Sequence, residues 1–269
     1  MVRVIPMPWG EAAATVVSHP GKPWLTLLHT LATDRSLWSG QVVELAQHFN
    51  LLLIDMRGHG DSAAAEPPYS IGGLSDDVVT IWDALEIPAS SVAGLSIGGM
   101  IALSLAAEHP DRVNAMIAGG CRAQTSDQFR AMWSARRALL TEGGLSAVID
   151  ATIPTWFPPE SLDANPALPK RVAEMIGKTS TAGYIGATQA LEELDLSDRL
   201  PAISAPCLLL VGDKDGPHPG EMAKMKEQIA HSDLTTITGA GHLPNLDQPG
   251  QFMAAIMPFL IENGAGNGE

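Results

Sequence analysis

Three residue types that together perform serine-dependent hydrolysis occur at widely separated points of this sequence, each directly after an apolar run. Ser96 lies in GLSIG (94–98), aspartates lie in DKDG (213–216), and His242 lies in AGHLPN (240–245). A serine hydroxyl becomes a good nucleophile when an imidazole takes its proton and a carboxylate orients that imidazole. The order serine, carboxylate, histidine after successive strands therefore predicts acyl transfer to Ser96.

The segment around Ser96 has the composition of a sharp strand-to-helix turn. Gly94 and Gly98 leave room for the turn, and a following helix would direct its N–H groups toward the serine. The run from Ile87 to Ala107 carries no charge and is long enough to cross a bilayer, but three glycines and four serines interrupt it. We therefore expect strand, turn and helix. An ordinary βα turn, in which glycine and serine only permit close packing, is the alternative.

Composition and charge narrow the class of protein. The chain has 269 residues, 45% of them apolar, which suits one large α/β domain. A formal charge of −14 argues against nucleic-acid and acidic-membrane partners. The first thirty residues lack the apolar core of a secretory signal, and Cys121 and Cys207 form no disulfide framework or metal motif, so we expect a cytoplasmic protein. The oligomeric state stays open.

Short apolar runs alternate with helical patterns over much of the chain, which predicts a doubly wound, mostly parallel α/β sheet. The expected strands are 24–29, 51–55, 91–95, 113–120, 207–212 and 234–239, and the expected helices between them include 74–87 and 219–230. Helical periodicity alone fills the stretch from 122 to 196, with several prolines as breaks, and predicts an inserted cap. The expected organisation is a core of 1–121 and 197–261, a cap of 122–196 and a flexible Gly-rich tail of 262–269.

Eight histidines compete for the role of general base. His242 follows the last expected strand, after the serine in the chain. His29 and His59 also follow strands but precede Ser96, so we assign them structural or pocket-lining roles. His218 lies in a Pro-rich turn.

Several motifs together resemble the 3-oxoadipate enol-lactonases of the α/β-hydrolase superfamily. The similarity extends from about residue 24 to residue 260. The motifs that carry it are GLSIGGMIAL (94–103), DMRGHGDS (55–62), LATDRSLW (31–38), TWF (155–157), VGDKD (211–215) and GAGHLPNLDQPGQF (239–252).

The resemblance implies a role for each residue of the constellation. Ser96 is the expected nucleophile and His242 the expected base. Asp215 is preferred to Asp213 as the acid, because the superfamily's acid ends a Gly-x-x-Asp turn, here 212–215.

The resemblance also implies an oxyanion hole formed by the backbone N–H groups of Ile97 and Leu31. The superfamily usually has glycine in the loop that carries the second donor, whereas this chain has Thr30 and Ala32 there. Only backbone donors are needed, so we still expect the hole.

An enol-lactone of an oxoadipate carries a carboxylate, so an acidic enzyme needs local cations to bind it. The segment from Arg112 to Arg137, which leads into the expected cap, holds arginines at 112, 122, 130, 136 and 137 against one acid, Asp127. Arg130, Arg137, Trp133 and His29 are the candidate substrate contacts. A solvated helix face for the arginines and core packing for the tryptophan are the alternatives.

Other functions on the same fold remain open. The rivals are an esterase or lactonase with another acyl substrate, a hydrolase of carbon–carbon bonds, and a receptor that retains the triad with slow turnover. A dehalogenase needs a carboxylate where Ser96 stands. We expect a small lactone or ester as substrate and neither a metal nor an organic cofactor, because metal-ligand spacings and the GxGxxG pattern do not occur.

Overall fold

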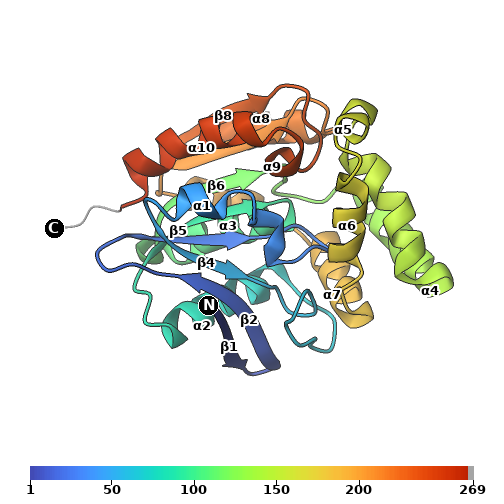
Figure 1. Cartoon of the computed structure of the whole chain (residues 1–269), viewed down its shortest axis with the longest axis horizontal. Coiled ribbons are helices and arrows are strands. Elements are labelled where there is room, and N and C mark those ends of the chain that lie inside the picture. The colour runs from blue at the N-terminus through green and yellow to red at the C-terminus, as the bar shows by residue number, and fades with distance from the viewer. Residues whose placement is uncertain (266–269) are drawn as a thin grey trace.

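The computed structural model describes residues 1–265, which form an eight-stranded sheet flanked by helices (Figure 1). The strands are β1 (Val2–Met7), β2 (Gly10–Val17), β3 (Trp24–Leu28), β4 (Asn50–Ile54), β5 (Ser90–Leu95), β6 (Val113–Gly119), β7 (Cys207–Gly212) and β8 (Ser232–Ile237). The α-helices are α1 (Val42–Leu45), α2 (Ile71–Ala84), α3 (Ile97–Glu108), α4 (Asp127–Trp156), α5 (Pro159–Ala164), α6 (Leu168–Ile176), α7 (Thr181–Glu192), α8 (His218–Gln228), α9 (Pro244–Asp247) and α10 (Pro249–Asn263). Three short 3₁₀ helices are η1 (Arg35–Trp38), η2 (Pro110–Arg112) and η3 (Ser197–Ala202).

The order of strands confirms the predicted fold class. The sheet runs β1-β2-β4-β3-β5-β6-β7-β8, with β2 antiparallel to both of its neighbours and all other pairs parallel. Every residue of β4, β5 and β7 is buried. Since successive side chains of a strand point to opposite faces, complete burial means that both faces are covered. The carboxyl ends of the parallel strands consequently meet at one edge, where their loops gather.

The antiparallel pair β1 and β2 is not among the predicted strands. The sequence of β2, GEAAATVV, contains three alanines, which have low preference for strands. In β1 only Ile5 and Met7 are buried, so the strand has a single apolar face at the margin of the sheet. The spacing of Ile5 and Met7, two residues apart, is the feature of the sequence from which β1 could have been predicted.

Helices α4 to α7 fill the interval between β6 and β7, and Figure 1 shows them gathered on one side of the sheet. The long helix α4 bends at Gly144, whose φ of 66° and ψ of −167° are not helical. An isolated bridge between Gln124 and Asp195 joins the chain where it leaves the sheet to the point of its return. The division into a core and a cap of 122–196 stays a prediction.

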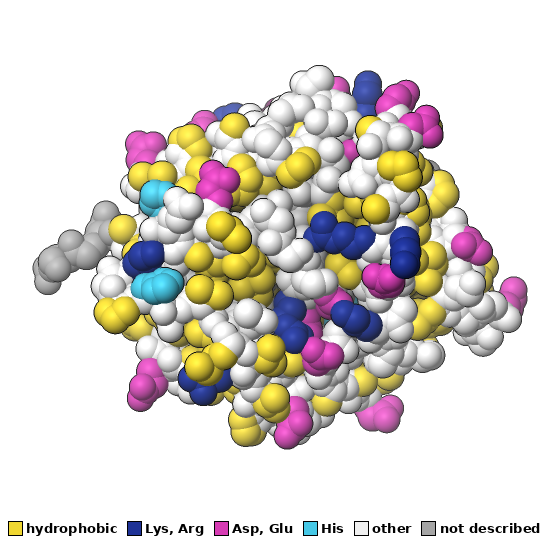
Figure 2. Space-filling model, in the orientation of Figure 1, with side chains coloured by type: hydrophobic (Ala, Val, Ile, Leu, Met, Phe, Trp, Pro, Cys, Tyr) yellow, Lys and Arg dark blue, Asp and Glu magenta, His cyan; other side chains and the backbone are white. Residues whose placement is uncertain are grey.

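Some of the contacts between this helical interval and the rest of the chain are polar. Lys178 forms an ion pair with the buried Asp34 at 2.9 Å, and Arg171 donates to the Ser39 hydroxyl at 3.0 Å. Figure 2 shows Lys and Arg side chains beside Asp and Glu side chains in the region where Figure 1 places α6. At Gly183 of α7 the approach is very close, because a β-carbon there would lie 2.3 Å from the carbonyl oxygen of Gly58.

The predicted flexible tail begins too early. Helix α10 continues to Asn263, and the carbonyl of Gly264 accepts a hydrogen bond from the Ser91 hydroxyl at 3.1 Å. The chain end therefore packs on the sheet as far as residue 264, because a strand residue holds it there. The rest of that prediction, 266–269, lies outside the described residues. Within residues 1–265, no helix has both the length and the apolarity to cross a bilayer.

Candidate active site

Ser96 occupies a strained turn between β5 and α3. Its φ of 55° and ψ of −118° lie outside the regions favoured by residues with a side chain, a feature that concentrates at functional sites. The neighbouring glycines permit this turn, because a β-carbon at Gly94 would lie 2.1 Å from the carbonyl oxygen of Gly98. The Ser96 N–H donates to the carbonyl of Gly119 on β6 at 2.7 Å, which fixes the turn to the sheet.

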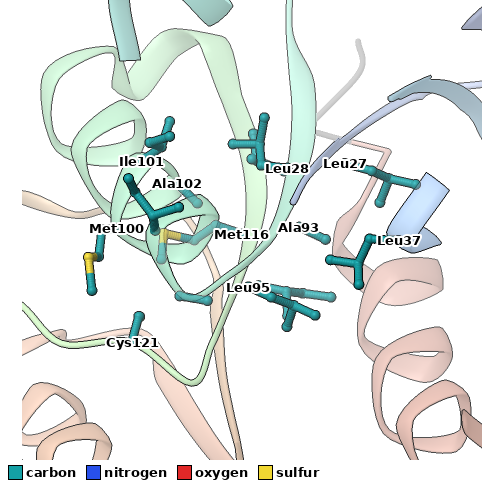
Figure 3. Close-up of a cluster of buried hydrophobic side chains, with 14 of the residues drawn as sticks. Leu27, Leu28, Leu37, Ala93, Leu95, Met100, Ile101, Ala102, Met116 and Cys121 are labelled. Carbon is teal, nitrogen blue, oxygen red and sulfur yellow. The ribbon is translucent and has the colours of Figure 1, made fainter. Parts of the chain in front are cut away.

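Apolar side chains from several elements support this turn. Figure 3 shows a cluster of apolar side chains from the elements that meet near it, among them Leu95 of β5, Met100 of α3 and Met116 of β6, and all three are buried. A packed shell of this kind resists displacement, since the interior of a protein has little free volume. The serine is therefore held rigidly at the carboxyl end of β5.

Asp215 and His242 meet at the same edge of the sheet. Asp215 follows β7 and His242 follows β8, and the Nδ1 atom of the histidine lies 2.9 Å from Oδ1 and 3.0 Å from Oδ2 of the aspartate. A carboxylate only accepts, so the imidazole donates its Nδ1–H. This leaves Nε2 unprotonated in the neutral ring, which is the state that a general base requires.

Asp213, the alternative acid, is occupied elsewhere. Its Oδ1 accepts the N–H of Gly239 at 2.7 Å, and its Oδ2 lies 4.0 Å from the ammonium of Lys214. It does not line the cavity that Asp215 lines. The geometry accordingly favours Asp215.

A second histidine, His218, also contacts Asp215. Its Nδ1 lies 3.1 Å from Oδ1 of the carboxylate, and its Nε2 lies 3.3 Å from a guanidinium nitrogen of Arg122. Because arginine only donates, Nε2 of His218 accepts and Nδ1–H donates, so the contacts form a chain from Arg122 through His218 to Asp215. The rings of His218 and His242 lie with their centroids 5.1 Å apart.

These donors keep Asp215 ionised. Burial alone would raise its pKa, but the charge of His242 and the hydrogen bonds from both imidazoles outweigh burial and lower the pKa from 3.8 to about 2. The carboxylate is therefore negative at neutral pH, where it can orient His242 and stabilise the imidazolium that proton transfer creates.

One cavity of about 280 Å³ joins these groups. Its lining combines the predicted triad with polar and aromatic side chains of α4 and α7. The lining residues include Thr30, Leu31, Ala32, Ser96, Arg122, Phe129, Met132, Trp133, Arg136, Trp156, Tyr184, Asp215, His218 and His242.

Ser96 and His242 share this lining, and within residues 1–265 no hydrogen bond joins the serine hydroxyl to the imidazole. Such bonds are often long without substrate and shorten when substrate binds. The assignment of Ser96, Asp215 and His242 as a catalytic triad therefore stays a prediction.

The two expected oxyanion donors lie on neighbouring segments. Ile97 is the first residue of α3, and Leu31 lies in the loop after β3. Neither N–H donates to another described residue. A β-carbon at Gly98 would lie 2.6 Å from the carbonyl of Leu28, so the start of α3 is pressed against the end of β3. The role of these N–H groups stays a prediction, and Ala32, next to Leu31, adopts a positive φ of 61°.

The predicted substrate contacts divide. Trp133 lines the cavity, whereas Arg130 and Arg137 do not. Arg130 is exposed and pairs with Asp127 at 2.8 Å, and Arg137 pairs with Glu192 of α7 at 2.7 Å. These two arginines serve contacts between helices and with solvent.

His29 also lies outside the lining. It is completely buried, and its Nε2 accepts the N–H of Met56 at 3.0 Å while its Nδ1 lies 2.8 Å from the carbonyl of Thr30. Burial lowers its pKa to about 4, so the ring is neutral and holds two loops together. This is a structural position rather than a substrate contact.

The sequence did not reveal the contact of His218 with Asp215, and it did not separate Arg122 from the neighbouring arginines. His218 lies three residues after Asp215, a spacing that returns a side chain to the same side of a turn or helix start. Arg122 lies three residues after the end of β6. This position near a strand end is the feature of the sequence from which its place at the site could have been predicted.

The histidines and Asp215 also present three atoms of metal-binding type within 4.8 Å of one another. The two imidazole N–H groups already satisfy the carboxylate, and Arg122 lies on the far nitrogen of His218. A metal ion would have to displace both imidazole protons beside a cation. These contacts therefore fit two imidazoles that donate to one carboxylate better than they fit a bound metal ion.

A family model described as alpha/beta hydrolase family matches residues 27–256. The chain belongs to this family. It is 30% identical to 3-oxoadipate enol-lactonase 2 of Acinetobacter baylyi over 236 residues, and this match covers 87% of each chain. It is 28% identical to a putative carbamate hydrolase of Caulobacter, over 86% of this chain and 87% of the relative.

Among solved structures, the enol-lactonase of Burkholderia xenovorans superposes with a TM-score of 0.92 and 28% identity, over 96% of this chain and all of the other. These results confirm the predicted resemblance and the fold. They support hydrolase activity on esters or lactones.

Proposed function

We propose that this α/β-hydrolase opens a lactone or cleaves a carboxylic ester through an acyl-enzyme at Ser96. The proposed substrate class is a small anionic lactone such as 3-oxoadipate enol-lactone. The single observation that carries the chemistry is the convergence of Ser96, Asp215 and His242, from three separate strand ends, on one cavity. The enol-lactonases among the similar proteins support the substrate class.

The first half of the reaction forms the acyl-enzyme. Nε2 of His242 takes the Ser96 proton as the serine oxygen attacks the carbonyl carbon, and Asp215 stabilises the resulting imidazolium. The N–H groups of Leu31 and Ile97 donate hydrogen bonds to the developing oxyanion, and these donors need no reorganisation. His242 then gives the proton to the leaving oxygen, which remains tethered when the substrate is a lactone.

The second half regenerates the enzyme. His242 takes a proton from water, hydroxide attacks the acyl carbon, and the serine oxygen leaves with the proton from the imidazolium. Rigid placement of Ser96 by its strained turn favours both halves, because the nucleophile does not have to be ordered for each attack.

Replacement of the serine tests the chemistry. Ser96→Ala should lower kcat by about 10⁶ on any ester or lactone that the wild type hydrolyses. Ser104→Ala is the matched control, because Ser104 lies on α3, is buried, and its hydroxyl has no partner within the described residues. Turnover by Ser96→Ala above a few per cent of wild type, with an intact fold, would refute the mechanism.

Covalent labelling gives an independent test. An aryl phosphonate should inactivate the wild type and add its mass to the peptide that contains Ser96, and Asp215→Asn should slow the labelling. A label on another residue contradicts the assignment. Assay of 3-oxoadipate enol-lactone beside neutral lactones, aryl esters and a carbamate then tests the substrate class, which fails if the enol-lactone is hydrolysed no faster than the neutral lactones.

A further inference from the structure

We propose that Arg122 is the substrate's anion-binding residue, so that the enzyme selects lactones and esters that carry a carboxylate. This inference rests on the proposed function and names the side chain responsible for its specificity. It replaces Arg130 and Arg137, the two arginines that the sequence favoured.

Arg122 is a buried guanidinium without an acidic partner. Arg122 is 4% exposed and lines the cavity. Within residues 1–265, no carboxylate lies within ion-pairing distance of its guanidinium. Among the described residues, its side chain forms one hydrogen bond, to Nε2 of His218. A guanidinium has five N–H donors, so most of them are left for a ligand.

The surroundings of Arg122 restrict where that ligand binds. The guanidinium carbon lies over the ring of Phe129, which covers one face of the plane and leaves the N–H edge for hydrogen bonding. Arg122, Phe129 and His218 all belong to the cavity lining, and His218 contacts the proposed acid of the triad. An anion on this edge therefore lies in the same cavity as Ser96.

Burial makes an anion favourable here. Desolvation lowers the pKa of Arg122, while Glu221, Cys121 and Asp215 act on it only at longer range. A buried cation without a hydrogen-bonded counter-ion is costly, and a carboxylate that forms two parallel N–H···O bonds removes that cost. Asp215 does not fill this role, because its oxygens accept from the two imidazoles.

The other arginines of this region are already engaged. Arg130 and Arg137 have acidic partners outside the cavity. Arg136 lines the cavity, but its terminal nitrogens donate to the Thr152 hydroxyl at 3.2 Å and the Ala151 carbonyl at 2.9 Å. Arg122 is thus the cavity arginine with the most donors free for substrate.

Matched pairs of substrates measure the selectivity. The mono-4-nitrophenyl ester of glutaric acid is compared with the 4-nitrophenyl ester of glutaramic acid, in which an amide replaces the carboxylate. A second pair, 4-acetoxybenzoate and 4-acetoxybenzamide, places the charge on the alcohol side. For the wild type we expect kcat/KM to favour the anion in at least one pair by about tenfold or more, since hydrogen bonds to charged groups are the stronger ones.

Three variants assign the selectivity. Arg122→Met keeps the length of the side chain on Phe129 and should lower the anion preference by about tenfold to a hundredfold. Arg122→Lys keeps the charge without the planar fork and should retain part of the preference. Arg130→Met removes the same charge from the same segment and should retain most of it, because that side chain is exposed and paired with Asp127.

The outcomes separate this proposal from the function on which it rests. A wild type without anion preference in either pair overturns the proposal, whatever the variants do, so misfolding of Arg122→Met does not protect it. A preference that survives Arg122→Met, or that falls equally in Arg130→Met, also overturns it. Failure of the proposed function is a different result: Ser96→Ala would hydrolyse the neutral amide-bearing ester at the wild-type rate.

Discussion

Replacing Gly94 with alanine probes the support of the reactive serine without touching its hydroxyl. The added β-carbon would lie 2.1 Å from the carbonyl oxygen of Gly98 and 2.7 Å from the backbone nitrogen of Gly99. Real β-carbons essentially never come closer than 3.0 Å to such atoms. Both obstacles are backbone at the start of α3, so no side chain can rotate away.

The expected loss of activity and stability in Gly94→Ala follows from the distance that the backbone must move. Relief of the overlap requires β5 and α3 to separate by about 1 Å, and a misplacement of that size costs about 100-fold in rate. Forcing extra volume into a packed core also costs about 1–3 kcal/mol in the free energy of unfolding. We therefore expect Gly94→Ala to lower kcat/KM about 100-fold and to lower the thermal midpoint.

The assay is hydrolysis of a small 4-nitrophenyl ester, with thermal unfolding measured on the same preparations. Gly72→Ala is the matched control, because Gly72 lies within α2 and a β-carbon there would have no neighbour within 4 Å. That control should keep its activity and gain up to about 1 kcal/mol from helix propensity. Wild-type activity and stability in Gly94→Ala would refute the packing argument.

Three shorter predictions concern ionisable side chains. Because the pKa of Asp215 is lowered from 3.8 to about 2 in the fold, its carboxylate contributes about 2 kcal/mol above about pH 4, lost as pH falls through 2. Asp215→Asn should flatten that loss in urea titrations at several pH values. Glu192→Ala leaves the half-buried Arg137 unpaired and should cost about 2 kcal/mol in urea unfolding, which Arg137→Met in the same chain largely restores. His218→Phe removes one donor to Asp215 and should lower kcat/KM about tenfold, with an altered pH–rate profile, whereas unchanged kinetics would show that the contact is only structural.

The parallel strands were predictable because burial on both faces leaves a continuous apolar run in the sequence. All six expected strands occur within two residues of their predicted limits, as β8 illustrates by spanning 232–237 instead of 234–239. The pair β1 and β2 was not predictable in the same way, since one face and one edge lie near solvent and alanine replaces the usual strand formers.

The arginines show where local sequence stops being informative. Arg130 and Arg137 lie on helix α4 beside the expected site, so composition alone made them candidate substrate contacts. Their roles depend on the side chains that they contact in the folded chain. The partner of Arg137 is Glu192, 55 residues further along the chain. Arg122 lacks such a partner among the described residues, and only the folded arrangement reveals that.

The sequence by itself determined the parallel α/β sheet, the turn around Ser96 and the chain order of serine, acid and histidine. These features depend on residue types and short-range spacing, which burial and backbone sterics translate directly into local structure. Tertiary structure decided that His218 also donates to Asp215, that His29 is buried beneath the loops, and that Arg122 lines the cavity with no carboxylate partner among residues 1–265. Hydrogen bonds and ion pairs depend on distances of a few ångströms between segments far apart in the chain, and folding alone sets those distances.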